Sequence, residues 1–391
     1  MTEQYRPLKI LCVHQGVELY GSDRSFLQSV LILREICPNA EIVVRLPGDG
    51  PLREAFEEQE FSPVIGGMWI IRKSHGVLGL ALRLPGLLVD IVKAACEIKK
   101  HDITYINTAV VLNYIAAARI SPERVAIHIR ELPVGVAAMV FGGLVRFSKA
   151  AIFFNSKATG EQFRLPQSQK SAVIHNGFAR PARSAPPAIT ADRPLRVALL
   201  GRINAWKGQD LLVEAVSLLP PDLRSRIEVA IIGGVFEGQP FDVALLRTIH
   251  ELGLVDVVKI EPFVDDPLSW YEWCDLAVVP SRKPEPFGRV AIEAMAHSRA
   301  VIAAAHGGLL EIVEPGSTGW LFEPNSAQDL ADILVEAIKD RAEVARRGVS
   351  AQAAFERHFT EEALAERFGE ALSSAFPALK LVMKSDLRDA G

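Results

Sequence analysis

Short apolar runs recur along the chain and alternate with segments in which apolar residues repeat at helical spacing. The runs lie near residues 8–14, 41–45, 103–107, 125–130 and 150–154, and again near 195–200, 227–232, 257–260, 275–280, 300–304 and 320–322. Continuous apolar runs of this length are typical of strands that are buried on both faces. Their alternation with helical patterns predicts an α/β fold that contains two doubly wound parallel sheets, each in a Rossmann-like domain.

The length of the chain also predicts two domains, because 391 residues exceed the usual size of one hydrophobic core. Residues 178–192 are rich in Pro and Ala and show little apolar periodicity. We therefore expect a first domain over residues 1–180, a linker over 181–192 and a second domain over 193–360. Residues 377–391 are expected to form a loose tail.

Two carboxylates in the second half are spaced so that both can face a ligand. Glu285 follows the apolar run 275–280, and Glu293 lies about two turns into the helical pattern that comes next. The free amides of Phe287, Gly288 and Arg289 at the start of that helix can hydrogen-bond a phosphate. Glu285 would then bind sugar hydroxyls and Glu293 ribose hydroxyls, although a surface loop with two solvated glutamates would show the same spacing.

Two cations follow the run 195–200, on a glycine-bounded turn that leads into another helical pattern. Arg202 and Lys207 could together neutralise a departing nucleoside diphosphate, or both could be solvated surface charges. The order Lys207-Gly208 differs from the Gly-Lys-Ser/Thr of a P-loop, which disfavours ordinary ATPase chemistry.

These blocks, together with the later stretches 306–313 and 316–322, resemble the retaining glycosyltransferases of family 4, which have the GT-B fold of two Rossmann-like domains that face each other across a cleft. The resemblance covers the second half and, more weakly, the first. It implies that Arg202 and Lys207 bind the donor diphosphate, that Glu285 contacts the transferred sugar and that Glu293 contacts the ribose. It also implies that a helix over residues 361–376 crosses back to the first domain.

A glycine-containing loop after the first strand carries Gly16 and Gly21, which would let the backbone approach a donor phosphate. Ser22 or Asp23 is available as the N-cap of the following helix. The family usually has two adjacent glycines and an acid here, whereas Tyr20-Gly21-Ser22 has one glycine. Contact at Gly21 is therefore expected rather than the whole family pattern.

The run 125–130 ends in a second polar group of the first half. The family often places a His near this strand end, beside the reacting sugar. His128 could face the cleft or be a structural residue of the strand, and Arg130 could instead take the place of that His. Arg130 and Glu131 could equally form a simple ion pair.

Other features restrict the class of protein and its partners. Four cysteines without paired metal spacing suggest buried thiols in a reduced cytoplasm, and the amino terminus shows no signal peptide. No Asp-x-Asp motif is present, so we expect neither a metal nor another cofactor, with the nucleotide sugar acting as co-substrate. Nucleic acid is disfavoured as a partner, because the net charge is −4 and the chain shows no basic-aromatic module.

Charge is distributed unevenly between the two halves. Residues 1–180 contain 21 Lys and Arg against 16 Asp and Glu, a net charge of +5, whereas the remainder has 22 against 31, a net charge of −9. The basic half holds two apolar stretches, residues 77–98 and 134–145, and Arg146 and Lys149 follow the second. Both stretches are too interrupted to span a bilayer. They could lie on an anionic membrane surface or face the core of the first sheet.

The sequence therefore predicts a metal-independent glycosyltransferase that moves a sugar from a nucleotide diphosphate donor to a glycan or a polyprenyl- or other lipid-linked acceptor, in bacterial surface-polysaccharide assembly. The resemblance implies that the enzyme is retaining. Its expected place is the cytoplasm, at the inner face of the membrane if the basic half docks there. The expected catalytic residues are Arg202, Lys207, Glu285 and Arg130. A sugar-nucleotide epimerase and a non-catalytic sugar-nucleotide-binding subunit are the alternatives.

Overall fold

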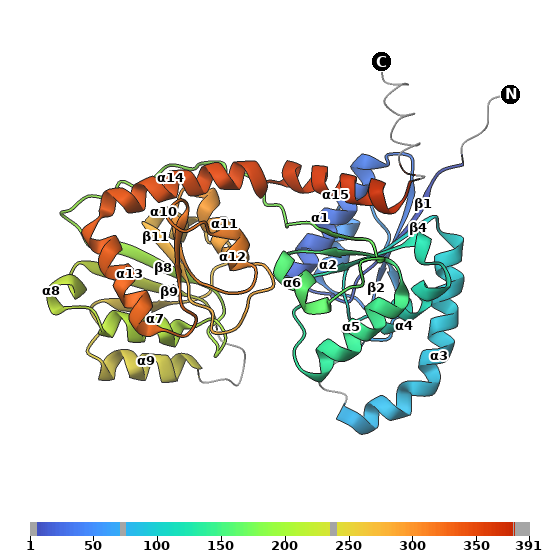
Figure 1. The fold of residues 1–391 in the computed structure, drawn as a ribbon, viewed down its shortest axis with the longest axis horizontal. Helices are drawn as coiled ribbons and strands as arrows, with labels where there is room; N and C mark the ends of the chain where they lie inside the picture. Colours follow the sequence, from blue (N-terminus) through green and yellow to red (C-terminus); the bar gives the residue numbers. More distant parts are fainter. Residues whose placement is uncertain (1–5, 71–75, 235–240, 378, 380–391) are drawn as a thin grey trace, which may run out of the picture. The chain divides into compact units, whose positions relative to one another are not determined.

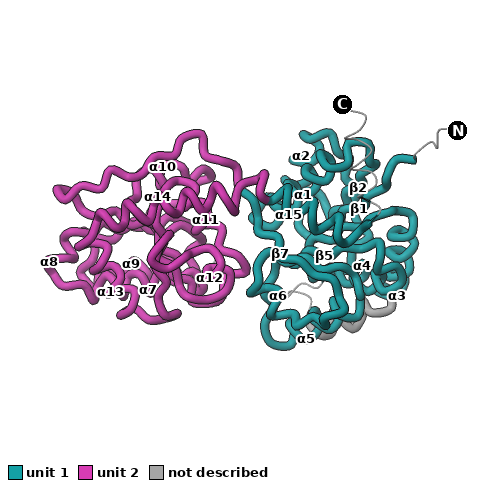
Figure 2. The backbone as a smooth tube through the Cα atoms, turned by 45° about the horizontal axis from the view of Figure 1, so that its top comes forward, with its two compact units in different colours: residues 1–177, 364–391 teal, residues 178–363 magenta. Residues whose placement is uncertain are grey.

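The computed structural model describes residues 6–70, 76–234, 241–377 and 379, and the side chains of residues 76–85 lie outside the description. The chain divides into two compact units, which are coloured separately in Figure 2. Unit 1 comprises residues 1–177 and 364–391, and unit 2 comprises residues 178–363. Most of the expected loose tail, residues 380–391, lies outside the described residues.

Unit 1 contains a seven-stranded parallel sheet in the order β3-β2-β1-β4-β5-β6-β7. Its strands are β1 Lys9–Val13, β2 Glu41–Leu46, β3 Val64–Ile65, β4 Ile103–Ile106, β5 Val125–Ile129, β6 Ala151–Phe154 and β7 Ser171–Val173. Its helices, labelled in Figure 1, are α1 Gly21–Ile36, α2 Pro51–Glu57, α3 Gly76–Lys100, α4 Leu112–Ala117, α5 Val136–Ser148 and α6 Lys157–Phe163, with short 3-10 turns η2 Ala118–Ile120 and η3 Pro122–Arg124.

Unit 2 contains a six-stranded parallel sheet in the order β10-β9-β8-β11-β12-β13. Its strands are β8 Leu195–Leu200, β9 Ile227–Ile232, β10 Val258–Glu261, β11 Leu276–Val279, β12 Ala300–Ala304 and β13 Gly319–Phe322. Its helices are α7 Gln209–Ser217, α8 Pro221–Arg224, α9 Phe241–Glu251, α10 Leu268–Trp273, α11 Arg289–Ala296, α12 Leu309–Ile312, α13 Ala327–Lys339 and α14 Arg341–His358.

Both sheets are buried on both faces, as the continuous apolar runs predict. Along β8, Val197 and Leu199 contribute to one core cluster, whereas Ala198 and Leu200 contribute to another. Alternate residues of a strand point to opposite faces, so helices must cover both sides of the sheet. The two doubly wound sheets expected from the sequence are therefore confirmed.

Two strands were not predicted, and both lie at the edges of the unit 1 sheet. β3 is two residues long and both of its residues are exposed, and β7 is three residues long with no buried residue. Neither has the buried apolar run by which the other strands could be recognised. Edge strands pair on one side only, and short ones leave little pattern in a sequence.

The structure draws the boundary between the units differently from the prediction. Unit 2 begins at Phe178, and hydrogen bonds hold residues 181–192 against it: Arg299 donates to the Ala185 carbonyl at 2.8 Å, and Ser184 and Ser298 share a bond of 3.0 Å. The segment expected to be a linker is thus anchored to the surface of unit 2.

The last long helix, α15 Glu361–Ala375, passes from one unit to the other. Its residues from Leu364 onward belong to unit 1, where the Phe368 ring packs edge-on against Tyr105 at a centroid distance of 5.3 Å. The end of the chain therefore completes the core of the unit that contains its beginning.

Candidate active site

The loops that follow β8, β11 and β12 lie beside one another at one edge of the unit 2 sheet. The three strands are parallel neighbours, so their carboxyl ends reach the same edge. The loop after β8 carries Arg202 and Lys207, the loop after β11 carries Glu285, and the loop after β12 carries His306. Residues far apart in the sequence are thereby brought to one place.

Lys207 and Glu285 form a direct ion pair at this edge. The Lys207 Nζ lies 2.6 Å from Oε1 of Glu285, and the Ser281 hydroxyl donates to the same oxygen at 2.5 Å. Glu285 is only 7% exposed. Two donors at short distances fix the orientation of this nearly buried carboxylate. The sequence placed Lys207 and Glu285 at strand ends but did not indicate that they are in contact.

Hydrogen bonds also join the loop of cations to the loop that holds Glu285. The Arg282 amide donates to the Trp206 carbonyl at 2.7 Å, and the Trp206 indole donates to the Lys283 carbonyl at 3.0 Å. Arg202 is exposed on the first of these loops, where its carbonyl accepts from Gln209 at 2.9 Å. The linked loops therefore bring the exposed Arg202 and the ion-paired Lys207 to the edge that holds the Glu285 carboxylate.

Close packing of these loops requires a residue without a side chain at position 208. Gly208 has a φ of +75°, and a Cβ there would lie 1.9 Å from the Pro280 carbonyl oxygen, directly before the Ser281–Glu285 loop. Any larger residue would push the turn that carries Lys207 away from the end of β11.

Replacing Gly208 with Ala is expected to destabilise unit 2 by about 1–3 kcal/mol more than replacing Gly253 with Ala, since overpacking adds to a backbone strain that both positions share. Gly253 is a matched control, because its φ is +65° but nothing lies within 4 Å of its Cβ position. Chemical denaturation of the two variants measures the difference. Equal losses would show that the close approach to Pro280 is unimportant.

Glu293 lies on the first turns of α11 and has two partners. Arg289 donates to its Oε1 at 3.3 Å, and Tyr271 donates to its Oε2 at 3.1 Å. Burial and the neighbouring carboxylate raise the pKa of Tyr271 well above its usual value of 10.0, so its phenol stays a donor. The sequence indicated a role for the backbone amide of Arg289. It did not indicate the ion pair of the Arg289 side chain or the hydrogen bond from Tyr271.

The residues before α11 are held tightly in the core. The Phe287 side chain is 3% exposed and packs at 6.3 Å, centroid to centroid, against Phe359. Gly288 is the N-cap of α11 with a φ of +113°, and a Cβ there would lie 2.7 Å from a Leu309 methyl group. At Phe287 and Gly288, the backbone rather than a side chain is therefore what a ligand could contact.

In unit 1 the loop after β1 is organised around Asp23. The His14 Nε2 lies 2.7 Å from Asp23 Oδ1, and the Tyr20 amide donates to Oδ2 at 3.0 Å. A Cβ on Gly16 would lie 1.9 Å from Oδ1, so this glycine lets the loop close on the carboxylate. Gly21 is the first residue of α1. The N-cap is Tyr20 rather than Ser22 or Asp23. Asp23 is the third residue of the helix, and its carboxylate accepts from the Tyr20 amide.

His128 and Arg130 at the end of β5 are both buried, at 0% and 7% exposure. The Tyr105 hydroxyl lies 2.8 Å from His128 Nδ1, while burial and the charge of Arg130 lower the pKa of the imidazole well below 6.5. This favours the structural interpretation of His128. The Arg130 guanidinium donates to Asn107 at 2.7 Å and to Asn176, so it is also held within the unit.

The ion pair considered for Arg130 and Glu131 is not among the ion pairs of the described residues. The Glu131 carboxylate instead accepts from the Thr108 hydroxyl at 2.5 Å and from the backbone amides of Ala109 and Arg130 at 3.2 and 3.1 Å. Neutral donors satisfy the carboxylate, and neutral acceptors bind the guanidinium. The alternative of a simple ion pair is therefore disfavoured, because the two side chains bind different neighbours.

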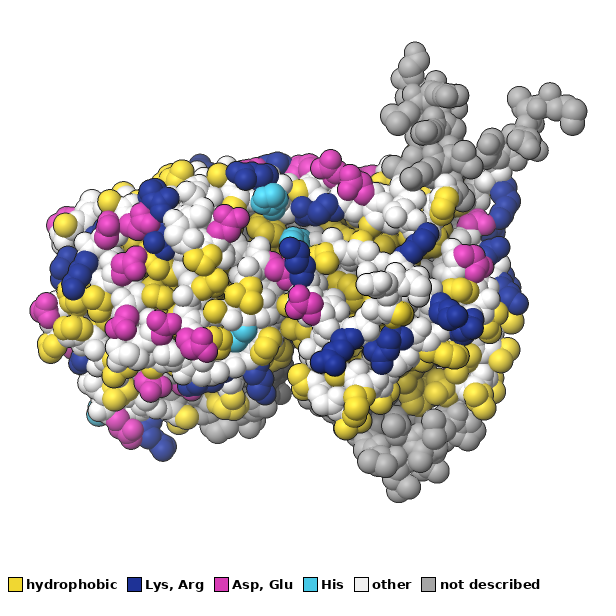
Figure 3. All heavy atoms as spheres, in the orientation of Figure 1, with side chains coloured by type: hydrophobic (Ala, Val, Ile, Leu, Met, Phe, Trp, Pro, Cys, Tyr) yellow, Lys and Arg dark blue, Asp and Glu magenta, His cyan; other side chains and the backbone are white. Residues whose placement is uncertain are grey.

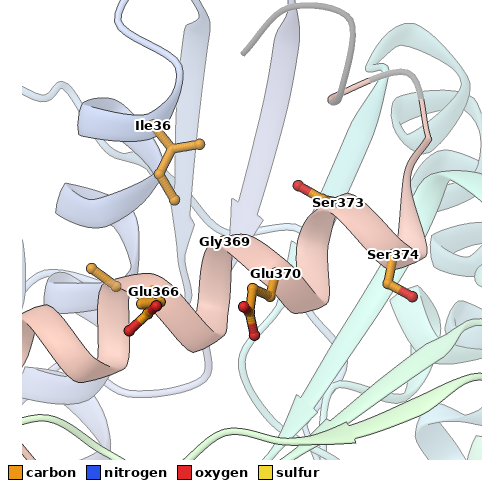
Figure 4. A pocket seen from close by; sticks show the side chains of 7 residues that line it. Ile36, Glu366, Gly369, Glu370, Ser373 and Ser374 are labelled. Atoms are coloured by element: carbon orange, nitrogen blue, oxygen red, sulfur yellow. The ribbon is translucent and has the colours of Figure 1, made fainter. Parts of the chain in front are cut away.

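A cavity of about 440 Å³ lies elsewhere, between α1 and α15 of unit 1 (Figure 4). Its lining residues are Ile36, Ala365, Glu366, Gly369, Glu370, Ser373 and Ser374. This lining contains two carboxylates and no cation, so it does not suit a diphosphate. Among the described residues, no group of three or more His, Cys, Asp or Glu side chains is placed to hold a metal ion.

Comparison with known proteins finds similarity in the part of the chain that carries the β8, β11 and β12 loops. Residues 186–354, which lie within unit 2, match the family model described as Glycosyl transferases group 1. Two proteins named D-inositol 3-phosphate glycosyltransferase are similar in sequence. That of Thermobispora bispora is 36% identical over 182 residues, covering 44% of this chain and 42% of its own length. That of Streptomyces scabiei is 34% identical over 235 residues, covering 56% and 52%. The chain thus spans about half or less of these relatives.

Solved structures extend the likeness to nearly the whole chain. Anabaena HepE, solved in complex with UDP and glucose, is 26% identical with a TM-score of 0.75, and the match covers 94% of this chain and 100% of HepE. Sucrose-phosphate synthase from Thermosynechococcus elongatus, at 19% identity and a TM-score of 0.70, shares the fold alone. With its two parallel Rossmann-like sheets, this chain has the GT-B fold.

Proposed function

We propose that this protein is a retaining, metal-independent glycosyltransferase that transfers a sugar from a nucleoside diphosphate sugar to a glycan or lipid-linked acceptor in bacterial surface-polysaccharide assembly. The observation that carries the proposal is the Lys207–Glu285 pair of 2.6 Å, which lies beside exposed Arg202 within the matched region. The HepE complex with UDP and glucose supports a nucleotide-sugar donor.

The roles follow from the chemistry of each group. Arg202 and Lys207 neutralise the diphosphate as the bond from the sugar carbon to its oxygen breaks, and electrostatic stabilisation of a leaving group is a large catalytic effect. Backbone amides at the start of α11, from Phe287 to Arg289, donate to phosphate oxygens. Glu285 accepts from sugar hydroxyls, and Glu293 accepts from ribose hydroxyls. In unit 1, the backbone at Gly16 and Gly21 approaches the donor, and Arg130 acts on the reacting sugar.

Retention is proposed to occur by attack of the acceptor hydroxyl on the face from which the diphosphate departs. The new bond joins the acceptor oxygen to the sugar carbon, and the acceptor proton passes to a donor phosphate oxygen. Lys207, Arg202 and the helix amides take the charge-neutralising role that a divalent cation would otherwise have.

A binding screen with UDP-, GDP- and ADP-sugars tests the donor half of this proposal. One nucleotide class is expected to bind, and its affinity is expected to fall when Arg202 is replaced by Ala. Absence of binding by all three classes would contradict a nucleotide-sugar site at the ends of β8 and β11.

We also propose that α5 of unit 1 docks on an anionic lipid surface, where a lipid-linked acceptor would be presented. Among the described residues, no helix combines the length and apolar character needed to span a bilayer. The inner face of α5 packs into the core through Phe141 and Val145, but Val136, Met139 and Phe147 are 70%, 68% and 56% exposed.

The charge around this exposed apolar face suits anionic lipid. Helix α5 contains no acidic residue, and Arg146 and Lys149 lie at its end. The Arg119 guanidinium lies 5.9 Å from the centre of the Phe147 ring. Hydrophobic and basic side chains lie side by side on this part of unit 1 in Figure 3. An apolar helix face with a basic border can insert at the level of the lipid headgroups.

Binding to acidic vesicles is expected to weaken as salt rises through about 0.1–0.5 M, because surface charges are increasingly screened. Co-sedimentation should also weaken when Arg146 and Lys149 are both replaced by Glu, and when Met139 is replaced by Ser. Replacing the exposed Arg247 and Lys259 of unit 2 by Glu changes the net charge equally and is the control. Failure of the wild-type protein to bind acidic vesicles at low salt would favour a soluble acceptor.

A further inference from the structure

Ser281 is a wholly buried residue that binds the same carboxylate oxygen as Lys207. It is 0% exposed, and its hydroxyl donates to Glu285 Oε1 at 2.5 Å, while Lys207 Nζ lies 2.6 Å from that oxygen. The second oxygen, Oε2, accepts no hydrogen bond from any described residue. Both protein donors therefore lie on Oε1, and Oε2 is left to accept from a ligand.

The backbone of Ser281 is itself fixed from the neighbouring strand. The His306 Nε2 lies 2.7 Å from the Ser281 carbonyl oxygen. A carbonyl oxygen can only accept, so Nε2 carries the hydrogen in this contact. Because Pro280 packs against Gly208 and Ser281 is bound to His306, the loops after β8 and β12 hold the Ser281 hydroxyl in place.

The two donors to Glu285 differ in how easily they can leave. Lys207 is a mobile ammonium on a flexible stem, and its side chain is 28% exposed. A diphosphate carries more charge than one carboxylate and would attract Lys207 away from Glu285. Glu285, nearly buried, would then keep Ser281 as its one donor among the described residues. Isolating a buried carboxylate without a donor is strongly unfavourable.

We propose that Ser281 is a positioning residue for sugar transfer: it keeps the Glu285 carboxylate oriented, with Oε2 toward the transferred sugar, while Lys207 exchanges Glu285 for the donor diphosphate. This inference rests on the proposed glycosyltransferase function. In this inference, the short Ser281–Glu285 hydrogen bond of the free protein persists when the donor is bound. Without it, entry of the donor would remove the contact that orients its own sugar-binding carboxylate.

Replacing Ser281 with Ala is expected to lower kcat about 10-fold or more, the scale of a lost hydrogen bond to a charged group, with less than a twofold change in the affinity for bare nucleoside diphosphate. Replacing Ser281 with Thr, which keeps the hydroxyl, should restore most of kcat. In the double variant with Glu285→Gln, the two losses should not add, because both act on one carboxylate.

Ser298→Ala is the matched control. Ser298 is also 0% exposed in unit 2, and its hydroxyl donates to Gln352 Oε1 at 2.5 Å. The Ser298→Ala variant should keep its kcat. That result would show that the loss of a buried hydroxyl does not by itself lower kcat. Thermal unfolding of both alanine variants shows whether either has lost its fold.

The exchange of partners by Lys207 has its own test, which needs no acceptor. Glu285→Gln frees Lys207, so bare nucleoside diphosphate should bind several-fold more tightly, and the gain should disappear in the double variant with Lys207→Ala. Unchanged or weaker binding in Glu285→Gln would overturn the exchange.

Three outcomes separate this inference from the proposed function. Near-normal turnover in Ser281→Ala with a large loss in Glu285→Gln would overturn the positioning role and leave the proposed function standing. Equal losses of kcat and of nucleotide affinity in Ser281→Ala would also overturn that role. If the wild-type protein transferred no sugar from any donor, the proposed function itself would fail.

Discussion

Replacing Lys207 with Ala is expected to lower turnover about 10²-fold or more, the scale for removal of one electrostatic stabiliser of developing charge. Arg202→Ala is expected to have an effect of similar size. Arg202 is exposed, so its loss should leave folding intact, whereas Lys207→Ala also removes a partner from the nearly buried Glu285. Thermal unfolding therefore accompanies the steady-state kinetics of both variants.

Lys259 provides the control for this prediction. It is a lysine of the same unit, its Nζ lies 3.7 Å from a Glu228 oxygen, and it is located on β10 rather than in the loops after β8, β11 or β12. Lys259→Ala should leave turnover unchanged. Near-normal turnover in either Arg202→Ala or Lys207→Ala, with the true substrate, would show that the leaving-group assignment is wrong.

The second prediction separates the two carboxylates. Glu285→Gln is expected to lower turnover without weakening bare nucleoside diphosphate binding, because Glu285 is assigned to the sugar and competes for Lys207. Glu293→Gln is expected to weaken binding of the bare nucleotide by about 1–3 kcal/mol, the range for a lost hydrogen bond to a charged group. The two carboxylates belong to separate ion pairs, which makes this division testable.

Calorimetry with the bare nucleoside diphosphate measures how each variant changes nucleotide affinity. Steady-state kinetics with the complete donor measure how each variant changes turnover. Tyr271→Phe is a useful companion variant, since it removes one donor to Glu293 Oε2 and leaves the Glu285 pair untouched. Tyr271→Phe should weaken binding of the bare nucleotide, as Glu293→Gln does, but by a smaller amount. Equal losses of nucleotide affinity in Glu285→Gln and Glu293→Gln would contradict the division of roles.

The fold could be predicted where burial leaves a simple pattern. Central strands such as β8 and β11 are apolar on both faces, and their positions followed from the sequence. The two edge strands β3 and β7 have no such pattern, and the anchoring of residues 181–192 depends on side chains such as Arg299 that are distant in sequence.

The candidate site was predictable in its components and not in its contacts. Strand ends indicated Lys207 and Glu285, but their ion pair joins positions 78 residues apart and depends on the adjacency of β8 and β11. Ser281 follows β11 closely, yet nothing local shows that its hydroxyl turns toward Glu285. Arg130 stood out because it ends β5, but nothing local in the sequence indicated that its guanidinium donates to Asn107 and Asn176.

Transfer of a sugar to an acceptor is the most direct measurement of the proposed function. The protein is incubated with the nucleotide sugar that binds, with and without candidate lipid-linked acceptors, and mass spectrometry follows both the acceptor and the released nucleoside diphosphate. The expected result is an acceptor heavier by one sugar residue, an equal amount of nucleoside diphosphate, and loss of both in Lys207→Ala. Consumption of donor without an acceptor would indicate an epimerase, and donor binding without turnover across the acceptors would indicate a non-catalytic subunit; either result would contradict a glycosyltransferase.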